Sequence, residues 1–288
     1  MSQTTPPSWR AGAHWLPTDR RPLVMGIVNV TPDSFSDGGC FLDPGKAIEQ
    51  GLQLAAEGAD LLDIGGESTR PGAEPVPIDE ELRRVLPVIR GLVAQGAPPL
   101  SIDTRHVEVA AAALDAGACI VNDVQANRSD DSLWRLIRDS GAGYVCMHMQ
   151  GDPASMQRAP SYANVTSELL HFFAERLEQL ARLGVDPAQV AIDPGIGFGK
   201  TVEHNLQLLQ DLGDFTRLSR PILLGISRKS FLGRVTGAAT RDRIPAGLAC
   251  TVWAAQRGTR IFRTHDVAPT VQSLQILNAI ESCSRPKS

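Results

Sequence analysis

Two carboxylates and one amide stand where they could recognise a polar heterocycle. Asp103, Asn122 and Asp193 each follow directly on a short run rich in Val, Ile and Leu. A carboxylate can accept two parallel N–H donors from a planar amidine-like group, and an amide offers both a donor and an acceptor. The three side chains together could therefore outline the edge of an aminopyrimidinone ring. Each Asp alone could equally cap a helix or pair with an arginine.

Cations form a second set, in segments that follow other apolar runs. The set comprises Arg70, Lys229, Arg263 and His265. Guanidinium groups bind phosphate oxygens in bidentate fashion, so such a cluster fits a small polyphosphate. Lysine is rare in this chain, where only four of the 28 basic residues are Lys, which makes Lys229 notable. Arg70 alone could be a solvated loop residue, and His265 could pair with Asp266 at the start of a helix.

The segment DPGIGFGKT resembles a nucleotide-binding loop only at first sight. A Walker A loop needs Gly where this chain has Pro194, and the dinucleotide fingerprint needs Gly where it has Lys200. We expect these glycines to let the backbone approach a flat ligand, with Phe198 packing against it.

A soft metal site is not indicated either. The spacing of Cys40, Cys146, His148 and His204 matches no zinc pattern. A hard Mg2+ held jointly by Asn29 and by substrate phosphates remains compatible with the sequence, because Mg2+ commonly takes one protein ligand plus phosphates and water.

The elements that must position these residues alternate regularly. Short apolar runs predict buried parallel strands, and stretches long enough for helices follow them, for example Pro44–Glu57, Pro77–Ala94 and Asn164–Leu183. Eight such units favour one closed (β/α)8 TIM barrel over residues 21–288, an α/β fold in a single domain. Residues 1–20 are expected to be a flexible extension. The predicted strands are Leu23–Val28, Leu61–Ile64, Leu100–Ile102, Cys119–Val121, Tyr144–Met147, Val190–Ile192, Ile222–Ile226 and Thr259–Phe262.

Composition narrows the functional classes. The 288 residues are 42% hydrophobic and 21% charged, which indicates a globular chain. The net charge of -4 and the lack of basic runs argue against nucleic-acid or membrane-surface binding, and no apolar run is long enough to span a membrane. The N-terminus lacks the apolar stretch of an export signal, and five scattered cysteines indicate no disulfide framework. We therefore expect a cytoplasmic protein that binds small molecules.

The motifs taken together resemble the dihydropteroate synthase family. MGIVNVTPDSFSDGG, DIGGESTRPGA, SIDT, ND, MHMQGDPASMQ, DPGIGFGKTVEHN, GISRKSFLGR and RTHDV occur in the family's order over roughly Leu23 to Leu277. The resemblance implies a (β/α)8 barrel, often a homodimer. It also implies an enzyme that joins 6-hydroxymethyl-7,8-dihydropterin diphosphate to p-aminobenzoate, releasing diphosphate, and that sulfonamides block by mimicking p-aminobenzoate.

The same resemblance assigns roles residue by residue. The pterin would lie against Asp103, Asn122, Asp193 and Lys229. Mg2+ and the diphosphate would meet Asn29, with Thr69, Arg70, Arg263 and His265 around the phosphates. The p-aminobenzoate pocket would comprise Phe35, Pro71, Phe198 and Ser230. Asp33 would lie near the reacting carbon, and the catalytic set would be Asp33, Lys229, Arg263 and His265. Many family members have Lys shortly after SxDT, where this chain has Arg105 and His106.

The implied reaction needs no nucleophilic side chain. The dihydropterin can delocalise positive charge from the CH2 carbon, so the enzyme would stabilise the departing diphosphate and position the amine in an SN1-like displacement. Three alternatives stay open. A pterin-binding methyltransferase would share the Asp and Asn set but leave SRKS, STRPG and RTHD unexplained. A silent paralogue would bind ligand without turnover, and a sulfonamide-resistant variant would catalyse the same reaction.

Overall fold

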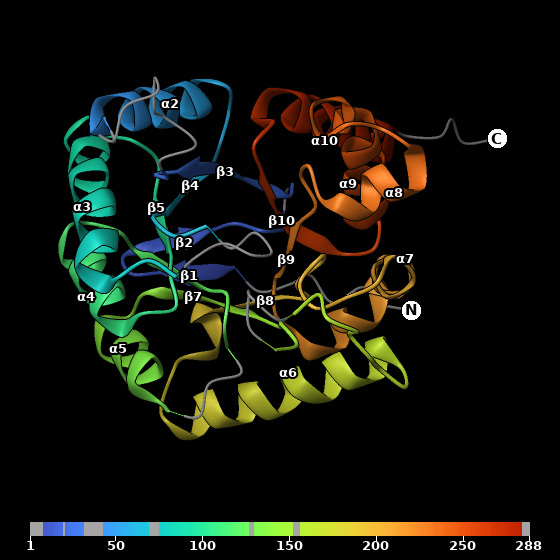
Figure 1. The fold of residues 1–288 in the computed structure, drawn as a ribbon, viewed down its shortest axis with the longest axis horizontal. Coiled ribbons are helices and arrows are strands. Elements are labelled where there is room, and N and C mark those ends of the chain that lie inside the picture. Colours follow the sequence, from blue (N-terminus) through green and yellow to red (C-terminus); the bar gives the residue numbers. More distant parts are fainter. Residues whose placement is uncertain are drawn as a thin grey trace.

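Eight parallel strands close into a barrel in the computed structural model of this chain (Figure 1). The structure describes residues 8–19, 21–31, 43–68, 75–126, 130–151 and 156–283. Each barrel strand pairs with the next along the chain, and the last pairs with the first. The predicted (β/α)8 barrel is confirmed, and strand ends lie within two residues of the predicted ones. The strands are β3 Leu23–Asn29, β4 Leu61–Gly65, β5 Leu100–Asp103, β6 Ile120–Asp123, β7 Gly143–Met147, β8 Val190–Asp193, β9 Ile222–Gly225 and β10 Thr259–Thr264.

Helices surround the strands, and capping side chains place their starts. In α2 (Pro44–Ala56) the Asp43 carboxylate accepts the backbone N–H of Gly45 at 2.8 Å. In α6 (Val165–Arg182) the Asn164 side chain accepts the N–H of Ser167. Both starts agree with the sequence prediction. The other helices are α3 Ile78–Ala94, α4 Val107–Asp115, α5 Ser132–Ser140, α7 Val202–Gln210, α8 Ser230–Thr236, α9 Ile244–Ala255 and α10 Val267–Ser282, with short 3-10 helices η1 Pro187–Gln189, η2 Leu212–Leu218 and η3 Thr240–Asp242.

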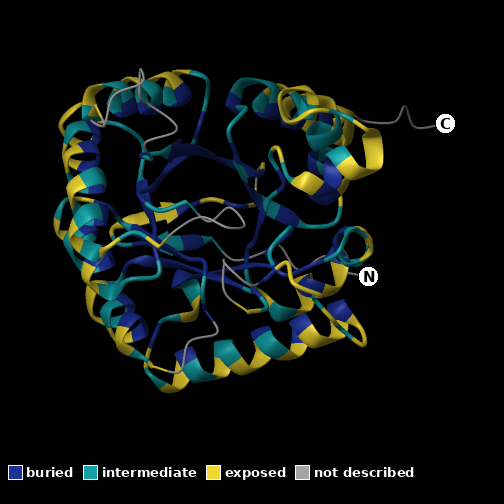
Figure 2. Cartoon of the chain, in the orientation of Figure 1, coloured by how far each residue is buried: buried dark blue, intermediate teal, exposed yellow. Residues whose placement is uncertain are grey.

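Two apolar layers hold the barrel together. Successive strand residues point to opposite faces, so Val24 packs toward the helices while its neighbour Met25 packs inside the barrel. Figure 2 shows the result, with buried strands at the centre and exposed residues on the outer faces of the helices. Within the described part of the chain, no helix combines the length and apolar character needed to cross a bilayer.

The N-terminal segment differs from the flexible extension that the sequence predicts. Its described part forms an antiparallel hairpin of β1 (Trp9–Ala11) and β2 (His14–Leu16). Trp9 is fully buried in the inner apolar layer, and its indole Nε1 donates to the carbonyl oxygen of Gln189 at 2.7 Å. Burial of an indole with its N–H satisfied outweighs the entropy of ordering the hairpin. The hairpin therefore covers the end of the barrel at which the strands begin.

Candidate functional site

The predicted pterin-binding residues converge at the opposite end of the barrel. Asp103 and Asp193 end β5 and β8, and Asn122 lies near the end of β6. They are only 8%, 5% and 3% exposed, respectively. Buried polar side chains at this end are costly unless they have partners, and in barrels of this type the ends of the strands carry the active site.

One arginine ties the bottom of this site together. Arg263, on β10, donates from Nε to Asp63 Oδ2 at 2.6 Å and from Nη2 to Asp103 Oδ2 at 2.6 Å. Asn122 Nδ2 donates to the same Asp63 oxygen at 3.0 Å. Asp63 is fully buried and was missed in the sequence analysis. Its signal was present, because an acid inside the apolar run LLDIG needs a partner when it is buried.

Burial leaves both strand-end acids easily protonated. It raises the pKa of Asp103 to about 7, although the charge of Arg263 opposes this shift. It also raises the pKa of Asp193 to about 6, although a hydrogen bond from Gly195 N to Asp193 Oδ1 at 2.7 Å opposes this one. Carboxylates poised near neutrality in a polar cluster are typical of functional sites.

Lys229 lies over the ring of Phe198. Its Nζ is 3.8 Å from the ring centroid, within range of a cation–π contact. Burial, with the nearby charge of Arg263, lowers the pKa of Lys229 to about 8. Gly197 has a φ of +82°, and a Cβ there would stand 3.1 Å from Lys229 Cδ. This glycine therefore makes room for the lysine, and not only for a flat ligand as the sequence suggested.

The lysine of the GKT sequence has a structural place. Lys200 is 3% exposed, and its Nζ donates to the carbonyl oxygen of Phe198 at 2.9 Å and lies 3.2 Å from His148 Nδ1. Burial lowers the pKa of Lys200 to about 7. Lys200 thus links the loop that carries Phe198 to the segment that carries His148. Because its Nζ contacts these protein groups, Lys200 has a structural role that needs no nucleotide-binding loop.

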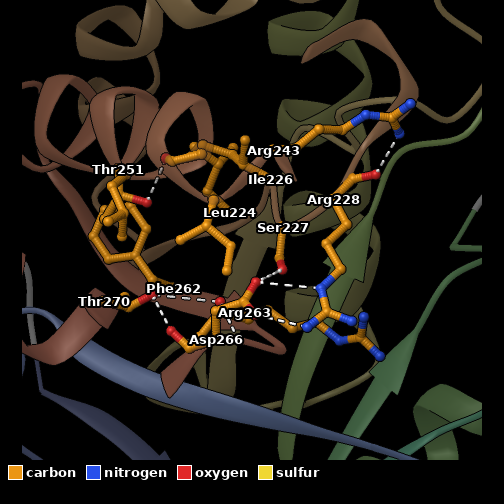
Figure 3. A pocket seen from close by; sticks show the side chains of 14 residues that line it. Leu224, Ile226, Ser227, Arg228, Arg243, Thr251, Phe262, Arg263, Asp266 and Thr270 are labelled. Atoms are coloured by element: carbon orange, nitrogen blue, oxygen red, sulfur yellow. Dashed lines mark hydrogen bonds and ion pairs between the residues drawn. The ribbon is translucent and has the colours of Figure 1, made fainter. Parts of the chain in front are cut away.

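His265 connects two sides of the barrel mouth. Its Nε2 is 3.4 Å from Asn29 Nδ2 at the end of β3, and its Nδ1 is 3.1 Å from Ser227 Oγ. Ser230 begins α8 and is exposed. Beside this group a small cavity of about 20 Å³ is lined by residues of β9, α9 and β10, and by Ser227 and Asp266, which follow β9 and β10 (Figure 3).

Comparison with known proteins identifies the family. The family described as "Pterin binding enzyme" matches residues 25–265. The Escherichia coli dihydropteroate synthase is 39% identical over 266 residues, covering 92% of this chain and 94% of that protein. A Xanthomonas albilineans dihydropteroate synthase structure with 4-aminobenzoic acid has a TM-score of 0.90 at 48% identity, covering 96% of this chain and all of that one. A Yersinia pestis dihydropteroate synthase in a sulfonamide drug complex has a TM-score of 0.89 at 39% identity, with the same coverage.

The chain belongs to the dihydropteroate synthase family. The predicted family, barrel and enzyme class, a transferase, are therefore confirmed.

Five residues that the family resemblance singled out lie outside the described part of the chain. Asp33 and Phe35 fall in residues 32–42, and Thr69, Arg70 and Pro71 fall in residues 69–74. Their roles remain predictions. The described residues that the structure brings together at the barrel mouth are Asn29, Asp103, Asn122, Asp193, Phe198, Lys229, Ser230, Arg263 and His265.

An acidic cluster lies beside the site in this chain, next to the Arg105 and His106 that follow SIDT. Potential metal-ligating atoms of Glu67, Glu81 and His106 lie within 4.8 Å of one another. Arg105 donates from Nη2 to Glu67 Oε1 at 2.9 Å, so this arginine already neutralises one of the acids. Glu81, on α3, is fully buried, and burial raises its pKa to about 7. This cluster could hold a cation, and the raised pKa of Glu81 means that the acid is also easily protonated in place of binding one.

Proposed function

We propose that this chain condenses 6-hydroxymethyl-7,8-dihydropterin diphosphate with p-aminobenzoate to give 7,8-dihydropteroate and diphosphate, in folate synthesis. The convergence of Asp103, Asn122, Asp193 and Lys229 at one barrel mouth carries the proposal. Two carboxylates and one amide match the donors and acceptors of an aminopyrimidinone edge. The family and the named 4-aminobenzoic acid complex of the Xanthomonas relative support the second substrate.

The proposed pterin site is deep. Asp103 and Asp193 would accept N–H donors of the ring, while Asn122, held by Asp63, would present its carbonyl oxygen. Lys229 would lie against the ring on the side where it contacts Phe198. The Arg263 guanidinium holds Asp103 at 2.6 Å, which fixes the direction in which that carboxylate faces.

The proposed diphosphate site adjoins the pterin site. Arg263 uses Nε and Nη2 for Asp63 and Asp103, so we assign its Nη1 to a phosphate oxygen. His265 and Asn29 would approach the same group, together with Thr69 and Arg70. A Mg2+ ion fits this donor set, because Asn29 offers one hard amide oxygen while its Nδ2 is turned toward His265. The ion would neutralise phosphate charge when it is bound.

The proposed aryl pocket combines apolar and hydroxyl groups. Phe198 and the exposed Ser230 flank Lys229 at the mouth, and Phe35 and Pro71 would complete the pocket. The Yersinia relative's sulfonamide complex supports the expectation that sulfonamides inhibit this enzyme.

The proposed chemistry is an SN1-like displacement at the pterin CH2 carbon. The bond from that carbon to the diphosphate oxygen breaks, and the amine nitrogen then bonds to the carbon and loses a proton. Arg263 and His265 would stabilise the departing diphosphate, and Asp33 would lie near the cationic carbon. Positional isotope exchange of a bridging oxygen label without p-aminobenzoate supports the stepwise route, whereas no exchange favours a concerted one.

We further propose a homodimer that works in the cytoplasm. The neighbouring helices α9 and α10 expose Trp253, Ile276 and Ile280, which supports a partner on this side of the barrel. Sedimentation equilibrium tests the dimer. We also retain residues 21–288 as one pterin-binding domain, with the hairpin packed on it.

Product formation from the two substrates, with and without Mg2+, tests the proposed function directly. We expect dihydropteroate and diphosphate in equal amounts, and only with the metal present. Ligand binding without turnover would indicate a silent paralogue. Transfer of a methyl group to or from a pterin would instead indicate a methyltransferase. A sulfonamide titration of the same assay separates a sensitive enzyme from a resistant one.

A further inference from the structure

The loop between β8 and α7, residues 194–201, carries Phe198 and is held by its backbone carbonyls. Carbonyl groups in a loop have no helix or sheet partner, so side chains or water must satisfy them. Three successive carbonyl oxygens here each accept from a different side chain: that of Gly197 from Gln157 Nε2 at 2.7 Å, that of Phe198 from Lys200 Nζ at 2.9 Å, and that of Gly199 from Tyr162 Oη at 2.9 Å. Two of these three carbonyl donors belong to the segment that follows β7, of which residues 148–151 and 156–164 are described.

The third carbonyl donor, Lys200, is anchored in that same segment. Its Nζ lies 3.2 Å from His148 Nδ1 and 3.4 Å from the His148 carbonyl oxygen. Burial lowers the pKa of His148 to about 3, so its ring is neutral and Nδ1 can accept a hydrogen bond. Together with the Phe198 carbonyl oxygen this makes three acceptors, which matches the three N–H donors of an ammonium group.

We propose that the three carbonyl donors are positioning residues for the ring of Phe198. Packing around the ring does not suffice to fix it, because Phe198 is partly buried against Val124, Met147, Met149 and Met156. Methionine side chains are flexible and adapt to what they contact. The cation–π contact with the Lys229 ammonium depends in turn on where the ring lies. The position of the ring must therefore come from the backbone that carries it.

The segment after β7 is itself braced, so it can hold the loop. Gln150 Nε2 donates to the Ser161 carbonyl oxygen at 3.0 Å, and Gln150 Oε1 accepts the Ser161 N–H at 3.1 Å. The next residue, Tyr162, meets the ring of His204 edge-to-face, with the ring centroids 5.0 Å apart. A Cβ at Gly199 would stand 2.6 Å from the carbonyl oxygen of Gln150, so the two segments are in backbone contact. Displacing one segment therefore displaces the other.

The consequence for catalysis concerns the second substrate. In the proposed function Phe198 forms part of the p-aminobenzoate pocket, and this part of the inference rests on that proposal. Loss of a carbonyl donor should weaken binding of the aryl acid, while Asp103, Asn122 and Asp193 still contact the pterin. The placement of the Phe198 ring in the free protein does not depend on the proposed function.

Lysine NMR measures that placement in the free protein. The chain has only four lysines, so 13C-labelled lysine gives few ε-CH2 signals, and Lys229→Arg assigns that of Lys229. Protons above the face of an aromatic ring are shifted upfield. At pH 6 Lys200 is charged, because its pKa is about 7. We expect the ε-CH2 protons of Lys229 to lie upfield in the wild type relative to Phe198→Leu, which removes the ring.

The same signal reports on the carbonyl donors. In Lys200→Met it should move most of the way toward its position in Phe198→Leu, and in Tyr162→Phe part of the way. Lys46→Met, on the outer helix α2, is the matched control and should leave the signal in place. A Lys229 signal that stays at the wild-type position in both Lys200→Met and Tyr162→Phe would overturn the proposal.

Steady-state kinetics with both substrates measure the effect on the aryl pocket. Loss of one hydrogen bond commonly costs about 2–10-fold in affinity, and we expect the KM for p-aminobenzoate to rise by that factor in Tyr162→Phe. The rise should be larger in Lys200→Met, which removes a charged donor from three acceptors. It should be smallest in Gln157→Ala, because Gln157 is exposed and water can replace its donor. The KM for the pterin diphosphate should not change, and Lys46→Met should behave as the wild type does.

The two measurements separate the possible failures. A merely structural role would lower the amount of folded enzyme and leave both KM values unchanged, and that result would contradict the role in the aryl pocket. If the wild type makes no product, the proposed function fails, and the Lys229 signal alone decides whether the carbonyl donors position the ring. Circular dichroism melting verifies that each variant folds. Tyr162→Phe removes only a hydroxyl group and keeps the test valid if Lys200→Met does not fold.

Discussion

Lys229 and Asp193 are the side chains whose loss should be most revealing. A hydrogen bond to a charged group contributes about 1.5–3 kcal/mol, so Lys229→Ala and Asp193→Ala should each lower kcat/KM by about 10–100-fold. Thermal unfolding should change little, since both lie at the ligand end of the barrel and not in its apolar layers. Steady-state kinetics with Lys46→Ala, on the outer helix α2, serves as the comparison.

Lys229→Arg sharpens this prediction. The guanidinium is larger and planar, whereas the ammonium 3.8 Å above Phe198 is compact, so we expect no rescue of activity. Wild-type turnover in either alanine variant would remove Lys229 or Asp193 from the proposed pterin site.

The acids and Lys229 together predict a bell-shaped pH profile. The pKa values are about 7 for Asp103, about 6 for Asp193 and about 8 for Lys229. As pH falls below about 7, the carboxylates gain protons and lose their ability to accept from the pterin. Above about 8, Lys229 loses its charge. The value of kcat/KM for the pterin diphosphate reports the free enzyme and should peak between these limits. A flat profile from pH 5 to 9 would contradict this assignment.

Single residues also show what the sequence could and could not reveal. Asp103, Asn122 and Asp193 were recognisable because each ends an apolar run, and the structure brings them to one mouth. Asp63 lies inside such a run, which signals that it needs a buried partner but does not tell which one. Its role depends on Arg263, 200 positions away along the chain, and no local pattern encodes that pairing.

At the scale of elements, the short apolar runs and the helix-length stretches between them predicted the barrel well. Each strand is a short apolar run because both of its faces are buried. Such a run can be recognised in the sequence without knowing which strands pair with it. The hairpin of β1 and β2 was not predicted, because strands of three residues are too short to show an alternating apolar pattern. Its order comes from burial of Trp9 against the barrel, a contact that the sequence alone does not display.

Helix α3 carries a buried acid that should make stability depend on pH. The pKa of Glu81 is about 7 in the folded protein, against a reference value of 4.5. Between these values the folded state keeps a proton that the unfolded state releases, so the free energy of unfolding falls as pH rises through this window. Glu81→Gln mimics the protonated form and removes the share of this dependence that Glu81 contributes, while Asp103 and Asp193, whose pKa values are also raised, keep theirs.

Urea unfolding at pH 5 and pH 8 measures this effect. We expect Glu81→Gln to match the wild type at pH 5 and to exceed it by about 1–3 kcal/mol at pH 8. Glu108→Gln, on the exposed face of α4, should behave as the wild type does at both values. If Glu81→Gln is less stable than the wild type at pH 8, the acid is ionised in the fold and the sign of the argument is wrong.

For the whole molecule, the hairpin should contribute to stability and not to substrate recognition. Trp9→Ala deletes a fully buried indole and should lower the free energy of unfolding by about 3–5 kcal/mol. Trp15, in the same hairpin, is 61% exposed, and Trp15→Ala should change it by at most about 0.5 kcal/mol. The KM for either substrate should not change in Trp15→Ala or in the folded fraction of Trp9→Ala. Equal destabilisation by the two substitutions would show that the hairpin does not pack as described.

The position of that hairpin also determines the end of the barrel through which ligands enter. With one end of the barrel covered, the mouth at the strand ends is the route by which ligands reach Asp103, Asn122 and Asp193. Ser230 is exposed at the same mouth, above those deeper groups. An aryl acid that arrived first at Ser230 and Phe198 would stand in the path of the pterin. From the proposed sites we therefore expect the pterin diphosphate to bind before p-aminobenzoate, and the joined product to leave through the same mouth.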